Sequence, residues 1–98
     1  MHILYRTNKL KKVCENRIEG VRKYGQKMGN IIPIRIDQLR NAISISHLIE
    51  NRIGRCHKLE GDREGQYAMD LVHPYRLIFT QEDEHTVNVM IEEITDYH

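Results

Sequence analysis

Hydrophobic residues recur every three or four positions through the first half of the chain, which is the spacing of an amphipathic helix. The stripe begins with Leu10, Val13, Cys14, Ile18 and Val21. A short apolar run from His2 to Tyr5 precedes it and predicts a strand. Asn8 follows this strand and belongs to a residue type that caps helix N-termini, so we expect the helix to begin there.

The same stripe continues in phase from Tyr24 to Ile43, although Pro33 lies inside it. Proline removes a backbone hydrogen bond, and its ring clashes with the carbonyl one turn back. The pattern therefore predicts one helix with a kink between Gly29 and Pro33. A break into two helices is the alternative, with Gly20 and Gly25 as further weak points.

Apolar and polar residues alternate in the second half of the chain, which predicts strands. Ser46 is expected to cap a short turn that reaches Arg52, and Gly54 is expected to end the helical structure. The predicted strands are Arg55 to Leu59, Tyr67 to Leu71, Tyr75 to Phe79 and a last one that begins with Val87, Val89 and Ile91. Short turns join them, so the pattern predicts an antiparallel meander packed on helices, an α+β domain.

Length and composition fit one small globular domain spanning residues 1–98. The chain has 98 residues, of which 40% are hydrophobic and 30% charged, enough for a single core. It begins without an apolar leader and has no run long enough to cross a membrane, so we expect a cytoplasmic protein. Cys14 and Cys56 then stay reduced, and we expect both to be small buried apolar groups.

Charge is distributed unevenly along the chain, although the net charge is only +1. Residues 1–50 hold ten Lys or Arg against four Asp or Glu, whereas residues 51–98 hold five against ten. A basic half attracts a phosphate backbone or an acidic protein, and an acidic half repels nucleic acid. A solvated helical face explains the same basic residues equally well.

Few residues stand out as candidates for chemistry. No glycine-rich phosphate loop, nucleophile elbow or metal-ligand spacing is present, so we expect neither a metal nor a cofactor. The last three residues, Asp96, Tyr97 and His98, can exchange protons or hydrogen bonds, although a frayed polar tail is the alternative. His57 and Arg76 lie on predicted strands, where solvent-facing sheet residues are the alternative.

Three sequence blocks resemble the HigB-type plasmid-maintenance killer proteins of the RelE/ParE toxin superfamily. They are Arg55 to Tyr67, Tyr75 to Phe79 and Asp96 to His98, in the order and spacing of that family. The resemblance implies a RelE-like microbial-ribonuclease fold, with N-terminal helices packed on a curved antiparallel sheet. One position departs from many relatives, because Glu60 stands where they have lysine.

The resemblance also implies a set of site residues for metal-independent RNA cleavage. Its catalytic positions fall on His57, Arg76, Asp96, Tyr97 and His98. Two histidines then do the acid and base work, Arg76 holds the phosphate, and Asp96 and Tyr97 orient a histidine and contact a base. The basic residues expected to bind the RNA backbone are Lys9, Lys11, Lys12, Arg17, Lys23, Lys27, Lys58 and Arg63.

The function implied by the resemblance is that of a type II toxin. Such a toxin cleaves messenger RNA on the ribosome and is held inactive by a helix-turn-helix antitoxin similar to HigA. Two alternatives stay open at this point. One is a ParE-like toxin that acts on DNA gyrase, and the other is an inactive toxin fold kept for pairing with a repressor.

Overall fold

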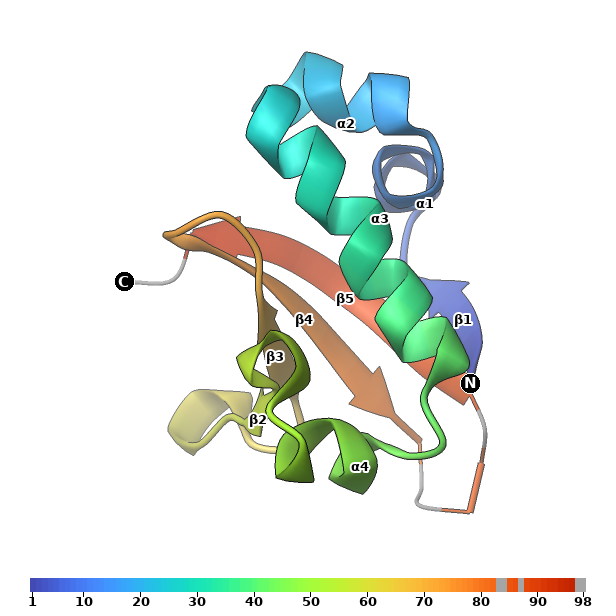
Figure 1. The fold of residues 1–98 in the computed structure, drawn as a ribbon. Coiled ribbons are helices and arrows are strands. Elements are labelled where there is room, and N and C mark those ends of the chain that lie inside the picture. Colours follow the sequence, from blue (N-terminus) through green and yellow to red (C-terminus); the bar gives the residue numbers. More distant parts are fainter. Residues whose placement is uncertain (83–84, 87, 97–98) are drawn as a thin grey trace.

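The computed structural model describes residues 1–82, 85–86 and 88–96, and it confirms the α+β class (Figure 1). The helices are α1 (Asn8–Glu15), α2 (Arg17–Tyr24), α3 (Gln26–Asn41) and α4 (Ile45–Glu50). The strands are β1 (His2–Tyr5), β2 (His57–Lys58), β3 (Tyr67–Asp70), β4 (Tyr75–Gln81) and β5 (Asn88–Asp96). Short 3₁₀ turns at Ile53–Arg55 and Gly61–Arg63 flank β2.

The long apolar stripe folds as three helices, so the prediction of one kinked helix is wrong. The chain leaves helical geometry at Asn16, whose side chain caps α2 by accepting from the Ile18 amide at 3.0 Å. It leaves it again at Gly25, where φ is 93°. Residues other than glycine rarely adopt this backbone angle. Gly25, which was expected to be a weak point of the helix, is therefore the residue at which α2 ends.

Pro33 lies inside α3, and the helix continues through it. The break falls earlier because α2 and α3 pack against each other through two glycines. An added Cβ at Gly29 would lie 2.3 Å from a Val21 methyl, and one at Gly20 would lie 3.6 Å from the Gly29 Cα. The chain must therefore reverse at Gly25 to bring these two helices into contact, a constraint that the local pattern does not contain.

Two predicted helix caps are displaced by one or two residues. Thr7, rather than Asn8, caps α1 by accepting from the Leu10 amide at 3.1 Å. Ser44, rather than Ser46, caps α4 by accepting from the His47 amide at 3.0 Å. All four residues have side chains that can cap, and the structure uses the one whose backbone is extended at the point where the helix starts.

The strand predicted from Arg55 to Leu59 is reduced to β2, which has only two residues. A 3₁₀ turn at Ile53–Arg55 takes up the start of the predicted strand, and Arg52, Gly54 and Arg55 all adopt positive φ angles between 53° and 59°. These left-handed residues turn the chain sharply between α4 and the sheet. Pairing with β3 can therefore begin only at His57.

The sheet has the strand order β1-β5-β4-β3-β2. The meander from β2 to β5 is antiparallel, as predicted, and a register shift between Ile78 and Phe79 interrupts the pairing of β4 with β5. The pattern did not predict that β1 joins the same sheet, parallel to β5. The predicted start of the last strand at Val87 lies outside the described residues.

Helices cover one face of this sheet and leave the other open (Figure 1). The main core joins α1, α3 and α4 to inward side chains of β3, β4 and β5, among them Met69, Leu77 and Phe79. Cys14 and Cys56 are 3% and 4% exposed and belong to this core, as expected. The second face holds a small separate cluster of Leu59, Ala68 and Ile78. Among the described residues, no helix is long and apolar enough to cross a membrane.

Candidate functional site

The register of the sheet decides which predicted site residues share a face. His57 lies opposite Ala68, and Ala68 lies opposite Ile78, so these three side chains point to the open face. Arg76 is two positions before Ile78 on β4 and therefore points the same way. His57 and Arg76 are two strands apart, about 10 Å across the sheet. The structure thus places both residues on the open face.

Arg76 belongs to a cluster of three arginines around Asp70. Its Nε lies 3.5 Å from one Asp70 carboxylate oxygen, and the Nε of Arg55 donates to the other at 2.6 Å. Arg35 reaches the same residue from α3, where its Nε donates to the Asp70 carbonyl at 2.6 Å and one Nη donates to Gln38. Two guanidinium groups thus pair with the Asp70 carboxylate and a third binds the backbone of the same residue, and the net positive charge favours an anion such as phosphate.

Burial lowers the pKa of Arg35, and the nearby Asp70 carboxylate raises it in part. Arginine nevertheless stays charged at every physiological pH. Asp70 and Arg55 were not named from the sequence. Only the register of β3 against β4 shows that Asp70 belongs to the site, because it lies directly opposite Arg76.

His57 is held by a short hydrogen bond next to this cluster. Its Nδ1 lies 2.8 Å from the carbonyl oxygen of Arg55. A carbonyl only accepts, so Nδ1 carries the hydrogen and the neutral ring keeps its lone pair on Nε2. That arrangement leaves Nε2 as the nitrogen able to take a proton from a substrate.

Arg63 also lies over the open face, but its charge is engaged. It pairs with Glu93 at 3.1 Å and donates to the Gln66 amide oxygen at 3.0 Å. Glu93 is opposite Ile78 on the neighbouring strand, so this pair covers the small cluster on that face. Glu93 is a second carboxylate near the site that the sequence did not single out.

The three C-terminal candidates are only partly covered by the structure. Asp96 is exposed and lies opposite Tyr75, one position beyond the Arg76–Thr95 pair. Strand alternation puts its side chain on the face of Tyr75, whose ring meets Tyr24 of α2 at 5.4 Å. Tyr97 and His98 lie outside the described residues, so the roles of all three stay predictions.

The basic residues expected to bind RNA fall into separate groups. The helical group is exposed and lies on α1, α2 and the start of α3, away from the open face. Its members are Lys9, Lys11, Lys12, Arg17, Lys23 and Lys27. Two of them make contacts, since Arg17 donates to Asn30 at 3.2 Å and the Lys23 ammonium lies 5.5 Å from the centre of the Tyr24 ring. Lys58 is exposed and points to the helix side of β2.

Metal ligands are not gathered anywhere in the part of the chain that the structure describes. No group of three or more His, Cys, Asp or Glu side chains there lies close enough to hold an ion. The described site holds a histidine, guanidinium groups and carboxylates.

The helices on one face of a five-stranded open sheet form a RelE-like toxin fold, which confirms the expected architecture. No family model matches the chain, and no curated protein matches it either. Solved structures do match it along most of its length.

One match is a YoeB–YefM complex from Staphylococcus aureus, with a TM-score of 0.65, 19% identity and coverage of 100% of this chain and 97% of that one. A YoeB/ParE toxin from Agrobacterium tumefaciens gives a TM-score of 0.61 and 12% identity, with both chains fully covered. A YafQ mutant from E. coli gives 0.62 and 18%, covering 96% of this chain and 90% of that one. Similarity at this level of identity concerns the fold.

Proposed function

We propose that this protein is the toxin of a type II toxin–antitoxin pair and that it cleaves messenger RNA on the ribosome. The observation that carries the proposal is the open sheet face, where a RelE-like fold presents His57 and the Arg76 cluster together. Two of the HigB-like sequence blocks, Arg55 to Tyr67 and Tyr75 to Phe79, fall on the elements that carry these residues. A solved complex of the same fold, YoeB with YefM, supports the expectation of a protein partner for this chain.

Metal-independent RNA cleavage requires a base for the 2′-hydroxyl proton, an acid for the leaving 5′ oxygen and positive charge on the phosphate. In the proposed mechanism the Nε2 of His57 takes or gives one proton, because Nδ1 is fixed on the Arg55 carbonyl. Arg76 stabilises the phosphate. The Asp96 side chain lies on the face opposite to His57, so the histidine that it orients in this mechanism is His98, the second acid–base group. Tyr97 contacts a base.

The setting of this reaction is also part of the proposal. The toxin acts in the cytoplasm, and a helix-turn-helix antitoxin similar to HigA holds it inactive. A group of exposed helical cations contacts ribosomal RNA through its phosphate backbone, at a distance from the reacting face: Lys9, Lys11, Lys12, Arg17, Lys23 and Lys27.

Induced expression in a bacterial host tests the proposal. The wild-type chain should arrest growth and create new messenger RNA 5′ ends. Co-expression of its antitoxin, whose gene we expect beside this one, should suppress both. Arg76→Ala and His57→Gln should each lower cleavage about 100-fold or more, the scale of a lost acid–base or charge-stabilising group. Arg22→Ala, which removes an exposed charge on α2, should cleave like the wild type. Growth without arrest and intact messenger RNA would contradict the proposal.

A second candidate is favoured by one match, because the Agrobacterium structure is described as a YoeB/ParE toxin. ParE-like toxins implied by the superfamily resemblance act on DNA gyrase. A supercoiling assay separates the two candidates. Inhibition of gyrase by the purified chain, with messenger RNA left intact, would favour this alternative.

A further inference from the structure

The free edge of the sheet at β2 is bordered by two hollows that meet at one side chain. The first, about 390 Å³, is lined by Arg52, Arg55, His57 and Ile49, with Cys56 behind them. The second, about 330 Å³, lies on the helix side and includes Ile49, Lys58 and Tyr67 in its lining. Ile49 of α4 lines both hollows, and we name the surface that the two hollows form along β2 the edge groove.

The charge of the edge groove suits a polyanion. Arg52, Arg55 and Lys58 are all exposed, and no Asp or Glu of the described residues lines either hollow. Glu60 and Glu64 line a neighbouring hollow that also includes Lys58 and Tyr67, so the carboxylates lie beyond the Lys58 end of the groove. Arg55 shares Asp70 with Arg76, whereas Arg52 and Lys58 form no ion pair with described residues. Their positive charges are therefore available to phosphate groups.

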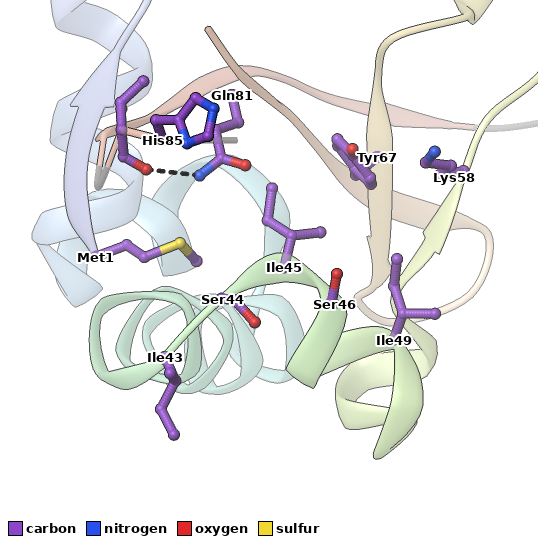
Figure 2. A pocket seen from close by; sticks show the side chains of 11 residues that line it. Met1, Ile43, Ser44, Ile45, Ser46, Ile49, Lys58, Tyr67, Gln81 and His85 are labelled. Atoms are coloured by element: carbon purple, nitrogen blue, oxygen red, sulfur yellow. Dashed lines mark hydrogen bonds between the residues drawn. The ribbon is translucent and has the colours of Figure 1, made fainter. Parts of the chain in front are cut away.

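The helix-side hollow adds a surface for a planar group. The ring of Tyr67 lies 5.6 Å from that of Phe79, with the planes 20° apart, so one of its faces is supported by the core. Figure 2 shows Tyr67 and Lys58 on one side of the hollow and Gln81 on the other, with Ile45 between them. A half-buried aromatic ring beside a lysine and apolar side chains is the arrangement that stacks bases of single-stranded nucleic acid.

Position links the groove to the reaction. His57 lines the first hollow and also points to the open face. An RNA chain that extends from the open face past His57 therefore enters the edge groove directly. We propose that the edge groove binds the single-stranded RNA next to the cleaved bond, with phosphates on Arg52, Arg55 and Lys58 and one base stacked on Tyr67. This inference rests on the proposed function and adds its substrate path.

Binding of a labelled single-stranded 2′-deoxy oligonucleotide tests the groove, because that probe lacks the 2′-hydroxyl and is not cleaved. Fluorescence anisotropy should show about threefold weaker binding for Lys58→Ala and for Arg52→Asn, and a shallower dependence of log affinity on log salt by about 0.7 for each. Asparagine is chosen at position 52 because it tolerates the left-handed backbone found there. Arg22→Ala is the control for loss of one exposed charge and should bind like the wild type.

The stacking contact has its own pair of variants. Tyr67→Leu should weaken binding about tenfold, whereas Tyr67→Phe keeps the ring and should bind normally. Circular dichroism reports whether Tyr67→Leu still folds, and the exposed positions 52 and 58 test the groove independently of that result.

The groove and the proposed function can fail separately. Unchanged affinity in Lys58→Ala and Arg52→Asn, or no binding of the probe by the wild type, overturns the groove even if messenger RNA is cleaved. Weaker binding in those variants together with intact messenger RNA supports the groove and contradicts the proposed messenger RNA cleavage. Loss of affinity for the co-expressed antitoxin, with probe binding unchanged, would show that this edge is a protein interface instead.

Discussion

The ion pairs and protonation of single residues in this protein depend on neighbours that the fold brings close. Asp70 has no special neighbour in the sequence, yet it meets Arg35, Arg55 and Arg76 in space. His57 gains a defined proton position only because the Arg55 carbonyl lies 2.8 Å from its Nδ1. The fold also sets the acidity of the Cys14 and Cys56 thiols, because it buries both of them.

Burial raises the pKa of Cys14 to about 12 and that of Cys56 to about 11, from an ordinary value of 9.0. A thiol that keeps its proton in the folded state stabilises the fold fully below pH 9 and loses that contribution as pH rises toward the folded pKa. We therefore expect the free energy of unfolding to fall above pH 9, by at most ~1.4 kcal/mol per pH unit for each thiol.

Urea unfolding at several pH values between about 8 and 10 measures this slope. The range ends at the ordinary tyrosine pKa of 10.0, because burial raises the pKa of Tyr5 and of Tyr24 above that value and adds a slope of the same sign as the unfolded tyrosines ionise. A Cys14→Ala, Cys56→Ala double variant should be less stable throughout, but its stability should change less with pH. An equal slope in both proteins would show that the thiols do not cause it.

Helix breaks and caps belong to the scale of whole elements. α2 and α3 are joined at Gly25 and packed through Gly20 and Gly29, which explains why an unbroken apolar stripe folds as separate helices. The stripe still reports most of the buried side chains, because Val13, Cys14, Ile32 and Leu39 lie in the core. Two of its members do not, since Ile18 and Ile43 are 66% and 84% exposed.

Gly29→Ala should destabilise the protein by about 1–3 kcal/mol, because the new methyl meets both the side chain and the backbone of Val21. The gain in helix propensity, about 1 kcal/mol, does not offset a contact that the backbone cannot relieve. Gly20→Ala is the matched control, since its nearest atom, the Val13 carbonyl oxygen, lies at 3.2 Å. Thermal unfolding should rank Gly29→Ala clearly below Gly20→Ala, and the reverse order would contradict the packing argument.

At the scale of the whole molecule, the two basic regions are separated by the sheet. The exposed cations of α1 to α3 lie on the helical layer, whereas the arginine cluster lies where β3 ends and β4 begins. Figure 1 shows these helices stacked on one side of the sheet. A partner as large as a ribosome can contact both regions, but a short oligonucleotide can reach only one at a time.

Replacing Lys9, Lys11 and Lys12 together by glutamine should therefore weaken co-sedimentation with ribosomes and make it less dependent on salt. These side chains are exposed, so the thermal midpoint should stay close to that of the wild type. Affinity for the short 2′-deoxy oligonucleotide should not change. Equal losses for ribosomes and for the oligonucleotide would show that the helical cations belong to the same binding surface as the groove.

The sequence by itself determined the α+β class, the helices before the meander, the buried cysteines and the strand positions of His57 and Arg76. These follow from local periodicity and turn chemistry, which operate over a few residues. Only the tertiary structure decided the break at Gly25, the two-residue length of β2 and the parallel pairing of β1 with β5. It also decided that His57 and the Asp70 cluster share the open face, because register between distant strands sets which side chains meet.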